Sequence, residues 1–247
     1  MKYNLSDISW VWFDLDDTLI DFQLNSKAAL NRTYIEAGLS RWFSSAEQWI
    51  ECYESHNYPL WDQLSRGEIT TEYLRMERFR RPLADAGADD TEARRISSML
   101  DPMYLDFLAQ EKTLLPGAAE ILCALRARGM RIGILSNGFA DVQHRKIRRA
   151  GIDGLIDLTV LSDDIGVQKP DLRLYRHAME RSGESDSSRH LMIGDNPSTD
   201  IAGAIAAGWG AILLQPQHAW QHPRPVPEGA TSAATLAEAA GMLGMKL

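Results

Sequence analysis

The sequence predicts an α/β protein with a doubly wound parallel sheet and an inserted helical domain. Five short apolar runs are typical of buried strands, and helical patterns separate the later runs from one another. Strands and helices that alternate at this pitch form βαβ units and therefore a parallel sheet. The inserted domain is indicated by the stretch between the first two runs, which has helical patterns and no strand signal.

The first strand is expected at residues 10–13. This run, Trp-Val-Trp-Phe, is too short for a helix and rich in aromatic and β-branched side chains, as in strands buried on both faces. The same reasoning predicts the other strands at residues 131–136, 158–161, 190–194 and 211–214.

Helices are expected between these strands, at residues 118–129, 141–151, 172–183 and 200–208. The first of them is introduced by Pro116-Gly117, and Gly129 provides its C-cap. The insert contributes further helical patterns at residues 26–37, 46–63, 71–83 and 91–110. We therefore expect a catalytic core at residues 1–20 and 98–247 and an α-helical domain at residues 21–97.

The segment 215–231 is predicted to be a surface loop. His218 and His222 have the spacing of two metal ligands on a helix, but Pro216, Pro223, Pro225 and Pro227 exclude a helix there.

Composition restricts the class of protein. The 247 residues are 45% hydrophobic and 24% charged, which suits a soluble globular chain, and the net charge of −8 argues against a nucleic-acid or anionic-membrane partner. No stretch has the length of a transmembrane helix, and the N-terminus lacks the apolar segment of a signal peptide. Cys52 and Cys123 lie far apart, so we interpret them as idle thiols of a cytoplasmic protein rather than as a disulfide or a metal site.

The segment Asp14-Leu15-Asp16-Asp17-Thr18-Leu19 follows the first strand directly. In open α/β sheets, ligands bind at the carboxyl ends of the strands. Carboxylates this close together need a cation between them or a shared proton when they are buried. The segment therefore predicts a metal ion, an acid/base pair, or both; the alternative is an ordinary acidic turn that caps a helix.

Polar residues also follow the later strands. Ser136-Asn137-Gly138 offers a hydroxyl, an amide and free N–H groups for phosphate oxygens, although a plain turn would have the same composition. Lys169 precedes a proline and is suited to bind an anion, unless it is a solvated surface lysine. Asp195 ends the fourth strand and is able to complete a metal site, whereas Asp200 is either a helix N-cap or a support for the ligands. Together these groups suit phosphoryl transfer with a hard divalent cation.

In these motifs the chain resembles the haloacid dehalogenase (HAD) superfamily. The resemblance rests on Asp14-x-Asp16-x-Thr18, on Ser136, on Lys169-Pro170, and on Gly194-Asp195 with Asp200. It implies a Rossmann-like core with a helical cap inserted after the first strand, and an Mg²⁺-dependent phosphatase that acts on a small phosphorylated metabolite.

The resemblance also implies residue roles. Asp14 is the nucleophile that forms an aspartyl-phosphate, and Asp16 protonates the leaving oxygen and then activates water. Thr18, Ser136 and Lys169 hold the transferring phosphoryl group, with Asn137 beside them. Mg²⁺ is held by the side chains of Asp14 and Asp195 and by the carbonyl of Asp16, with Asp200 behind these ligands.

A narrower resemblance is to the pyrimidine 5′-nucleotidase branch. It rests on Asn57-Tyr58-Pro59-Leu60-Trp61 with residues 67–70, on Ser136-Asn137-Gly138-Phe139 with Gln143, and on residues 163–170. Asn57 and Trp61 would bind the base, by hydrogen bond and by stacking, if α-helical spacing placed them on one face. Pro59 favours a helix start or a turn between them, and a buried aromatic is the alternative for Trp61.

Several other classes of protein share parts of this pattern. A phosphatase or phosphomutase for sugar phosphates or phosphoglycolate would use the same core with a different cap. A metal-independent 2-haloacid dehalogenase is disfavoured by Asp16 and Asp195, and a non-catalytic binding protein by the intact Asp14 and Asp16. A receiver domain places its acidic pair, phosphoacceptor and lysine on other strands, and the nicotinamide and P-loop glycine motifs are absent from the sequence. The oligomeric state stays open.

Overall fold

The computed structural model describes residues 3–215 and 224–247, which form two compact units. One unit comprises residues 1–23 and 112–247, and the other comprises residues 24–111. The sequence placed the second boundary after residue 97, whereas the compact units divide after residue 111. The difference arises because helix α4, Asp90–Leu108, runs without interruption past the expected boundary.

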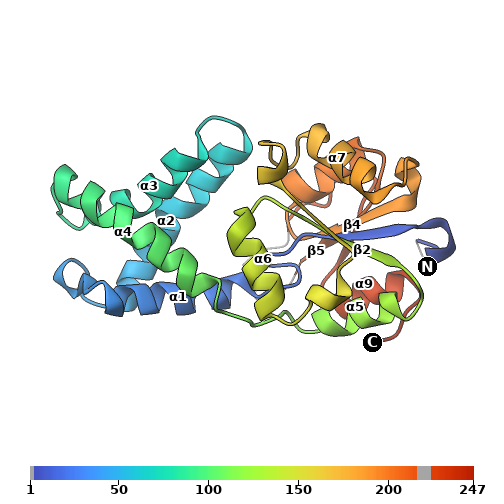
Figure 1. Ribbon diagram of the computed structural model, residues 1–247, viewed down its shortest axis with the longest axis horizontal. Helices are drawn as coiled ribbons and strands as arrows, with labels where there is room; N and C mark the ends of the chain where they lie inside the picture. The colour runs from blue at the N-terminus through green and yellow to red at the C-terminus, as the bar shows by residue number, and fades with distance from the viewer. Residues whose placement is uncertain (1–2, 216–223) are drawn as a thin grey trace. The chain divides into compact units, whose positions relative to one another are not determined.

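The first unit is built on a six-stranded parallel sheet in the order β3-β2-β1-β4-β5-β6 (Figure 1). The strands are β1 Trp10–Phe13, β2 Arg131–Ser136, β3 Leu158–Leu161, β4 His190–Gly194, β5 Gly210–Leu214 and β6 Thr231–Ala233. Strand β1 is central, with Trp10 opposite Arg131 of β2 and His190 of β4. The order reverses at β1, which confirms the predicted doubly wound α/β fold.

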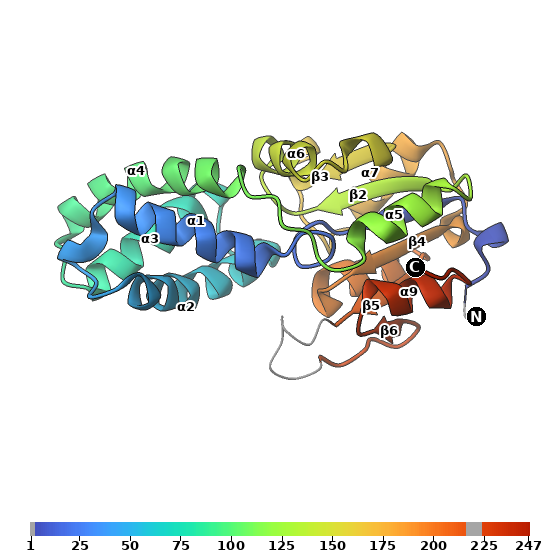
Figure 2. The same cartoon turned by 90° about the horizontal axis from the view of Figure 1, so that it is seen from below.

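Helices cover both faces of this sheet (Figure 2). The helices α5 Ala118–Arg126, α6 Ala140–Arg149 and α9 Leu236–Met242 pack on one face, and α7 Leu172–Ser182 and α8 Ala202–Ala206 pack on the other. Alternate side chains of β1 enter the two cores: Val11 and Phe13 join the first, Trp10 and Trp12 the second. Because β1 is buried on both faces, its sequence is apolar throughout, which is the pattern that predicted it.

Two elements of this unit were not predicted. Strand β6 and helix α9 follow a segment that the sequence analysis assigned to a loop, and the polar, three-residue β6 gives no apolar run. A π-helical turn, Pro197–Ile201, also replaces the start of the helix expected at residue 200. His218 and His222 lie outside the described residues.

The second unit consists of α1 Phe22–Glu36, most of which belongs to it, α2 Ala46–Ser65, α3 Thr71–Asp85 and α4. Its core is an aromatic cluster of Trp49, Tyr53, Phe79 and Tyr104, with ring centroids 5.1–6.1 Å apart. Helix α2 is continuous through Pro59, so the turn expected at that proline is wrong. Tertiary packing of a long helix outweighs the one backbone hydrogen bond that a proline removes.

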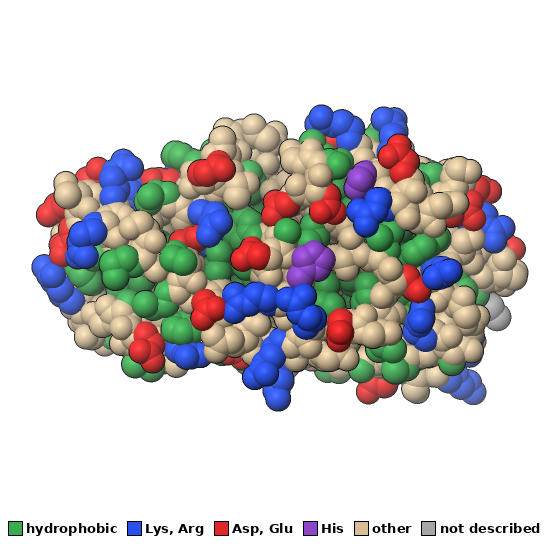
Figure 3. Space-filling model, viewed as in Figure 1, with side chains coloured by type: hydrophobic (Ala, Val, Ile, Leu, Met, Phe, Trp, Pro, Cys, Tyr) green, Lys and Arg blue, Asp and Glu red, His purple; other side chains and the backbone are tan. Residues whose placement is uncertain are grey.

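The surface agrees with the composition. Figure 3 shows Lys and Arg side chains mixed with Asp and Glu on the face that it draws, with no broad basic area on that face. Among the described helices, none is long and apolar enough to cross a membrane.

Candidate active site

The acidic loop after β1 is fixed by its own backbone. The N–H of Asp14 donates to the carbonyl of Ile193 on β4 (3.0 Å), which extends the sheet pairing by one residue. The chain then turns sharply, with Asp17 at a φ of 57° and hydrogen bonds from Leu19 and Ile20 back to Leu15. An aspartate tolerates this left-handed conformation better than most residues. The turn leaves Asp14 only 7% exposed.

Lys169 joins two of the predicted carboxylates. Its ammonium group lies 2.5 Å from Asp14 Oδ1 and 2.7 Å from Asp200 Oδ1, and it donates to the carbonyl of Leu135 at 2.7 Å. The three protons of the ammonium thus all have acceptors in the protein. Lys169 is 2% exposed, so it is not the surface lysine that the sequence left as an alternative.

Asp195 and Asp200 follow β4 and lie beside Asp14. One carboxylate oxygen from each of the three residues lies within 4.8 Å of the other two, and all three residues are buried. Asn196, and not Asp200, caps the following turn, and Asp200 Oδ2 accepts from the N–H of Asn196 (2.9 Å). Only glycine fits at position 194, because a Cβ there would lie 2.4 Å from Asp200 Oδ2.

The buried carboxylates are held at high pKa values. Burial raises the pKa of Asp14 to about 7, against the lowering effect of Lys169, and burial also raises the pKa of Asp17 to about 7. Burial and the charges of Asp200 and Asp14 raise the pKa of Asp195 well above its ordinary value. Ionised together, these oxygens repel one another, and a hard divalent cation is the group that relieves such repulsion.

The balance of charge supports a cation here. Five carboxylates, at positions 14, 16, 17, 195 and 200, face three basic side chains, Lys169, Lys146 and Arg224. A phosphate ester would add further negative charge. The residues present therefore fit a divalent cation, with Asp14 and Asp195 as its side-chain ligands.

The sequence assigned the hydroxyl groups of Thr18 and Ser136 to phosphate binding, and both residues are buried. Thr18 is completely buried, and its Oγ1 has no hydrogen-bond partner among the described residues. A buried hydroxyl without a partner costs roughly 1–3 kcal/mol, which a phosphoryl oxygen would recover. Ser136 ends β2, is 2% exposed, and its Oγ accepts from the N–H of Gly138 at 3.2 Å.

Both oxygens of Asp16 contact side chains of helix α6. Gln143 Nε2 donates to Asp16 Oδ2 and to Ser136 Oγ, both at 2.8 Å. Lys146 forms an ion pair with Asp16 Oδ1 and donates to Gln143 Oε1 at 2.9 Å. Both α6 side chains are at most 2% exposed. A Cβ at Gly138 would lie 2.2 Å from Gln143 Nε2, so the glycine leaves the room that this amide occupies.

Lys146 was missed by the sequence analysis. A lysine on an amphipathic helix is usually a solvated side chain, and its partner Asp16 is far away along the chain. The only available signal was Gln143, which was noted as part of a motif and lies three residues earlier on the same helix.

Asn137 is placed differently from expectation. Its Oδ1 accepts from the N–H of Lys169 (2.7 Å) and its Nδ2 donates to the carbonyl of Lys169 (3.1 Å). Both ends of the amide are thus used to hold the Lys169 backbone. This geometry favours a positioning role over the predicted contact with substrate.

Asn57 and Trp61 both lie on α2 in the second unit, one helical turn apart. Asn57 is 5% exposed and its Oδ1 accepts from the hydroxyl of Tyr53 (3.2 Å), which ties it to the aromatic cluster. Trp61 is half-buried. Contact of either residue with a nucleobase remains a prediction.

Known proteins resemble the chain over most of its length. Residues 8–208 match the family model of haloacid dehalogenase-like hydrolases. The chain is 33% identical over 223 residues to pyrimidine 5′-nucleotidase YjjG of Escherichia coli (strain K12), covering 89% of each protein. It is 28% identical over 215 residues to pyrimidine 5′-nucleotidase PynA of Streptococcus pneumoniae, covering 87% of each. The crystal structure of the HAD-hydrolase YfnB from Bacillus subtilis, bound to magnesium, superimposes with a TM-score of 0.84 at 24% identity over 96% of this chain and 99% of that one.

Proposed function

Because the chain belongs to the haloacid dehalogenase-like hydrolases, we propose that it is an Mg²⁺-dependent 5′-nucleotidase for pyrimidine nucleoside monophosphates that acts through an aspartyl-phosphate. The observation that carries the chemistry is the pairing of Asp14 with Lys169 beside Asp195, while Asp16 is held separately by Gln143 and Lys146. One carboxylate is thereby arranged as nucleophile and another as acid and base.

In the first half-reaction, an oxygen of Asp14 attacks phosphorus and the ester P–O bond breaks. Lys169 neutralises charge on the nucleophile side, and the hydroxyl groups of Thr18 and Ser136 donate to phosphoryl oxygens. Asp16 gives its proton to the oxygen of the leaving nucleoside. The products of this step are the nucleoside and a phosphoryl group bonded to Asp14.

In the second half-reaction, Asp16 is a carboxylate and takes a proton from water. The water oxygen attacks phosphorus, the bond between phosphorus and the Asp14 oxygen breaks, and inorganic phosphate leaves. Asp16 is then protonated again, and both residues have returned to their starting states. The contacts of Gln143 and Lys146 with the two oxygens of Asp16 are those of its carboxylate form, and they orient it to take the proton from water.

Asp14, Asp195 and the carbonyl of Asp16 are the residues that would hold Mg²⁺. The ion, when bound, supplies neutralisation of the charge on the phosphoryl oxygens. Asp200 supports this set by binding Lys169 and the N–H of Asn196 rather than by acting on substrate. The magnesium-bound relative YfnB supports this assignment of the cofactor.

The relatives, rather than the site, support the substrate class in this proposal. Both YjjG and PynA are pyrimidine 5′-nucleotidases, and each aligns with more than four-fifths of the chain, the helical unit included. In this proposal the helical unit is a cap, and its residues Asn57 and Trp61 select the base. Glyceraldehyde 3-phosphate phosphatase of Methanothermobacter thermautotrophicus, at 32% identity, supports sugar phosphates as the alternative.

A screen of phosphate release tests the proposal. The purified protein with Mg²⁺ is offered pyrimidine and purine nucleoside monophosphates, sugar phosphates, phosphoglycolate and a 2-haloacid. We expect the highest kcat/KM with a pyrimidine nucleotide. A higher value with a triose phosphate or phosphoglycolate would refute the nucleotidase proposal, and halide release without metal would refute the phosphatase mechanism.

A further inference from the structure

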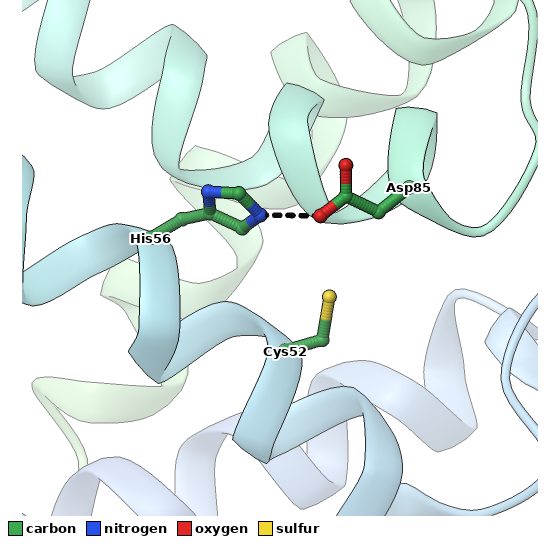
Figure 4. A group of neighbouring side chains, drawn as sticks. All are labelled: Cys52, His56 and Asp85. Carbon is green, nitrogen blue, oxygen red and sulfur yellow. Dashed lines mark hydrogen bonds and ion pairs between the residues drawn. The ribbon is translucent and has the colours of Figure 1, made fainter.

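Three side chains with different metal-binding atoms meet between α2 and α3 in the second unit (Figure 4). Cys52 and His56 are one turn apart on α2, and Asp85 is the last residue of α3. One ligand atom from each lies within 4.8 Å of the others, and His56 Nε2 is 2.7 Å from Asp85 Oδ2. Figure 4 shows the thiol of Cys52 directed toward the His56–Asp85 pair.

The distances between the metal-binding atoms of the three side chains suit a single ion. Bonds of about 2.0–2.3 Å to sulfur, nitrogen and oxygen place the ligands of a tetrahedral zinc ion within roughly 4 Å of one another. The two α2 residues share a helix face by their four-residue separation, and α3 supplies the third ligand from the neighbouring helix. Small side-chain rotations are therefore enough to surround an ion.

The group is also open to solvent. Cys52 and His56 are half-buried, and the side chain of Asp85 is 61% exposed, so an ion can enter and a water molecule can complete its coordination. Burial and the charge of Asp85 raise the pKa of the Cys52 thiol. A divalent cation would offset this cost of forming the thiolate, because it would replace the thiol proton.

We propose that Cys52, His56 and Asp85 bind one Zn²⁺ ion, with water as the fourth ligand. Thiolate and imidazole select a borderline-soft ion such as Zn²⁺, whereas Mg²⁺ prefers the oxygen ligands of the first unit. Binding releases the proton of the Cys52 thiol and leaves the imidazole neutral, with its remaining proton on Nδ1. The ion would join α2 to α3 and stabilise the helical unit.

The competing explanation is that His56 and Asp85 form an ordinary contact between two helices beside an idle thiol. Cobalt separates the two explanations because a thiolate ligand gives Co²⁺ a charge-transfer band in the near ultraviolet. The full-length protein is stripped with chelator, supplied with excess Mg²⁺ to occupy the oxygen site, and titrated with Co²⁺. The variants Cys52→Ser and Cys123→Ser form a matched pair, since each removes one of the two thiols.

We expect the cobalt band in the parent protein and in Cys123→Ser, and its loss in Cys52→Ser. Competition with a chromophoric chelator should then show that His56→Gln and Asp85→Asn weaken Zn²⁺ binding at least tenfold. Zn²⁺ should raise the melting temperature of the parent protein and of Cys123→Ser but not that of Cys52→Ser, and melting curves in chelator establish that each variant is folded. A cobalt spectrum that is unchanged by Cys52→Ser, or zinc affinity that is unchanged by His56→Gln, would overturn the proposal.

Discussion

Replacing Asp14, the proposed nucleophile, should stabilise the metal-free protein while it abolishes activity. Asp14→Asn keeps the shape of the side chain but removes a negative charge that burial disfavours, and an amide cannot attack phosphorus. Lys169 retains Asp200 and the carbonyl of Leu135 as partners in the variant, so its ammonium is not left unpaired.

The magnitude of the stabilisation by Asp14→Asn follows from the pKa of Asp14, which burial raises from 3.8 to about 7. At 1.36 kcal/mol for each pH unit, ionising Asp14 in the folded protein costs on the order of 4 kcal/mol above neutral pH. This pKa already contains the attraction between Asp14 and Lys169, which lowers it, so the loss of that attraction in the variant is included in the figure. We therefore expect Asp14→Asn to raise the free energy of unfolding by roughly 4 kcal/mol near pH 8.

The stability difference between Asp14→Asn and the parent protein should grow as the pH rises. Well below pH 4 the carboxyl is protonated in both the folded and unfolded states, so its ionisation does not change the free energy of unfolding. Between pH 4 and 7 only the unfolded state loses the proton, and the parent protein loses stability as the pH rises. The stability advantage of the variant should therefore widen by about 2–3 kcal/mol between pH 5 and pH 8.

Thermal melts in excess chelator at the two pH values measure this advantage. Asp153→Asn removes one carboxylate from an exposed position and controls for the change in net charge. Addition of Mg²⁺ should raise the melting temperature of the parent protein more than that of the variant. A variant that is less stable than the parent at pH 8, or an advantage that does not change with pH, would refute the reasoning, and turnover by pure Asp14→Asn would refute the covalent mechanism.

Four further outcomes test the remaining assignments. Asp16→Asn should lower kcat by on the order of 10²–10⁴ with alkyl phosphates and by less with p-nitrophenyl phosphate, so equal losses would contradict an acid role. Lys146→Met should lower kcat in the parent protein but have little effect in an Asp16→Asn background, and independent, additive losses would show that Lys146 does not act through Asp16. Chelation should stop turnover and Mg²⁺ restore it, whereas Ca²⁺ should support little, and activity in chelator would favour the dehalogenase chemistry. Trp61→Ala should raise KM for pyrimidine nucleotides by the equivalent of about 1–3 kcal/mol and leave p-nitrophenyl phosphate nearly unchanged, while parallel losses and a lower melting temperature would indicate a core tryptophan.

Most strands of the sheet were predictable because nearly all of their residues are buried. Buried strands form apolar runs in the sequence, and these runs placed β1 to β4 at the bounds that the structure gives. Strand β6 lies at the edge of the sheet, and its three residues carry no such signal. Sequence information was thus sufficient where an apolar run marks a strand, the edge strand β3 included, and insufficient for the short polar β6.

In the candidate site, too, some residues could be placed from the sequence and others could not. Asp14, Ser136, Lys169 and Asp195 could be placed together because the carboxyl ends of parallel strands meet at one edge of the sheet. The contact of Lys146 with Asp16 could not be predicted in this way. It depends on the rotation of α6 about its own axis, which the residue pattern of the helix does not determine. The hydrogen bonds that divert Asn137 to the Lys169 backbone are likewise a tertiary property.

In the proposed mechanism, the two buried lysines allow neighbouring aspartates to have different roles. Lys169 binds Asp14 within a cluster of buried carboxylates, where a cation is required before all of them can be ionised. Lys146 binds Asp16 together with Gln143, which also contacts Ser136. In the proposed mechanism, these contacts link the orientation of Asp16 to the hydroxyl that would hold the phosphoryl group. A phosphatase needs this link because the proton must arrive as the ester bond breaks, whereas a dehalogenase releases halide, which needs no proton.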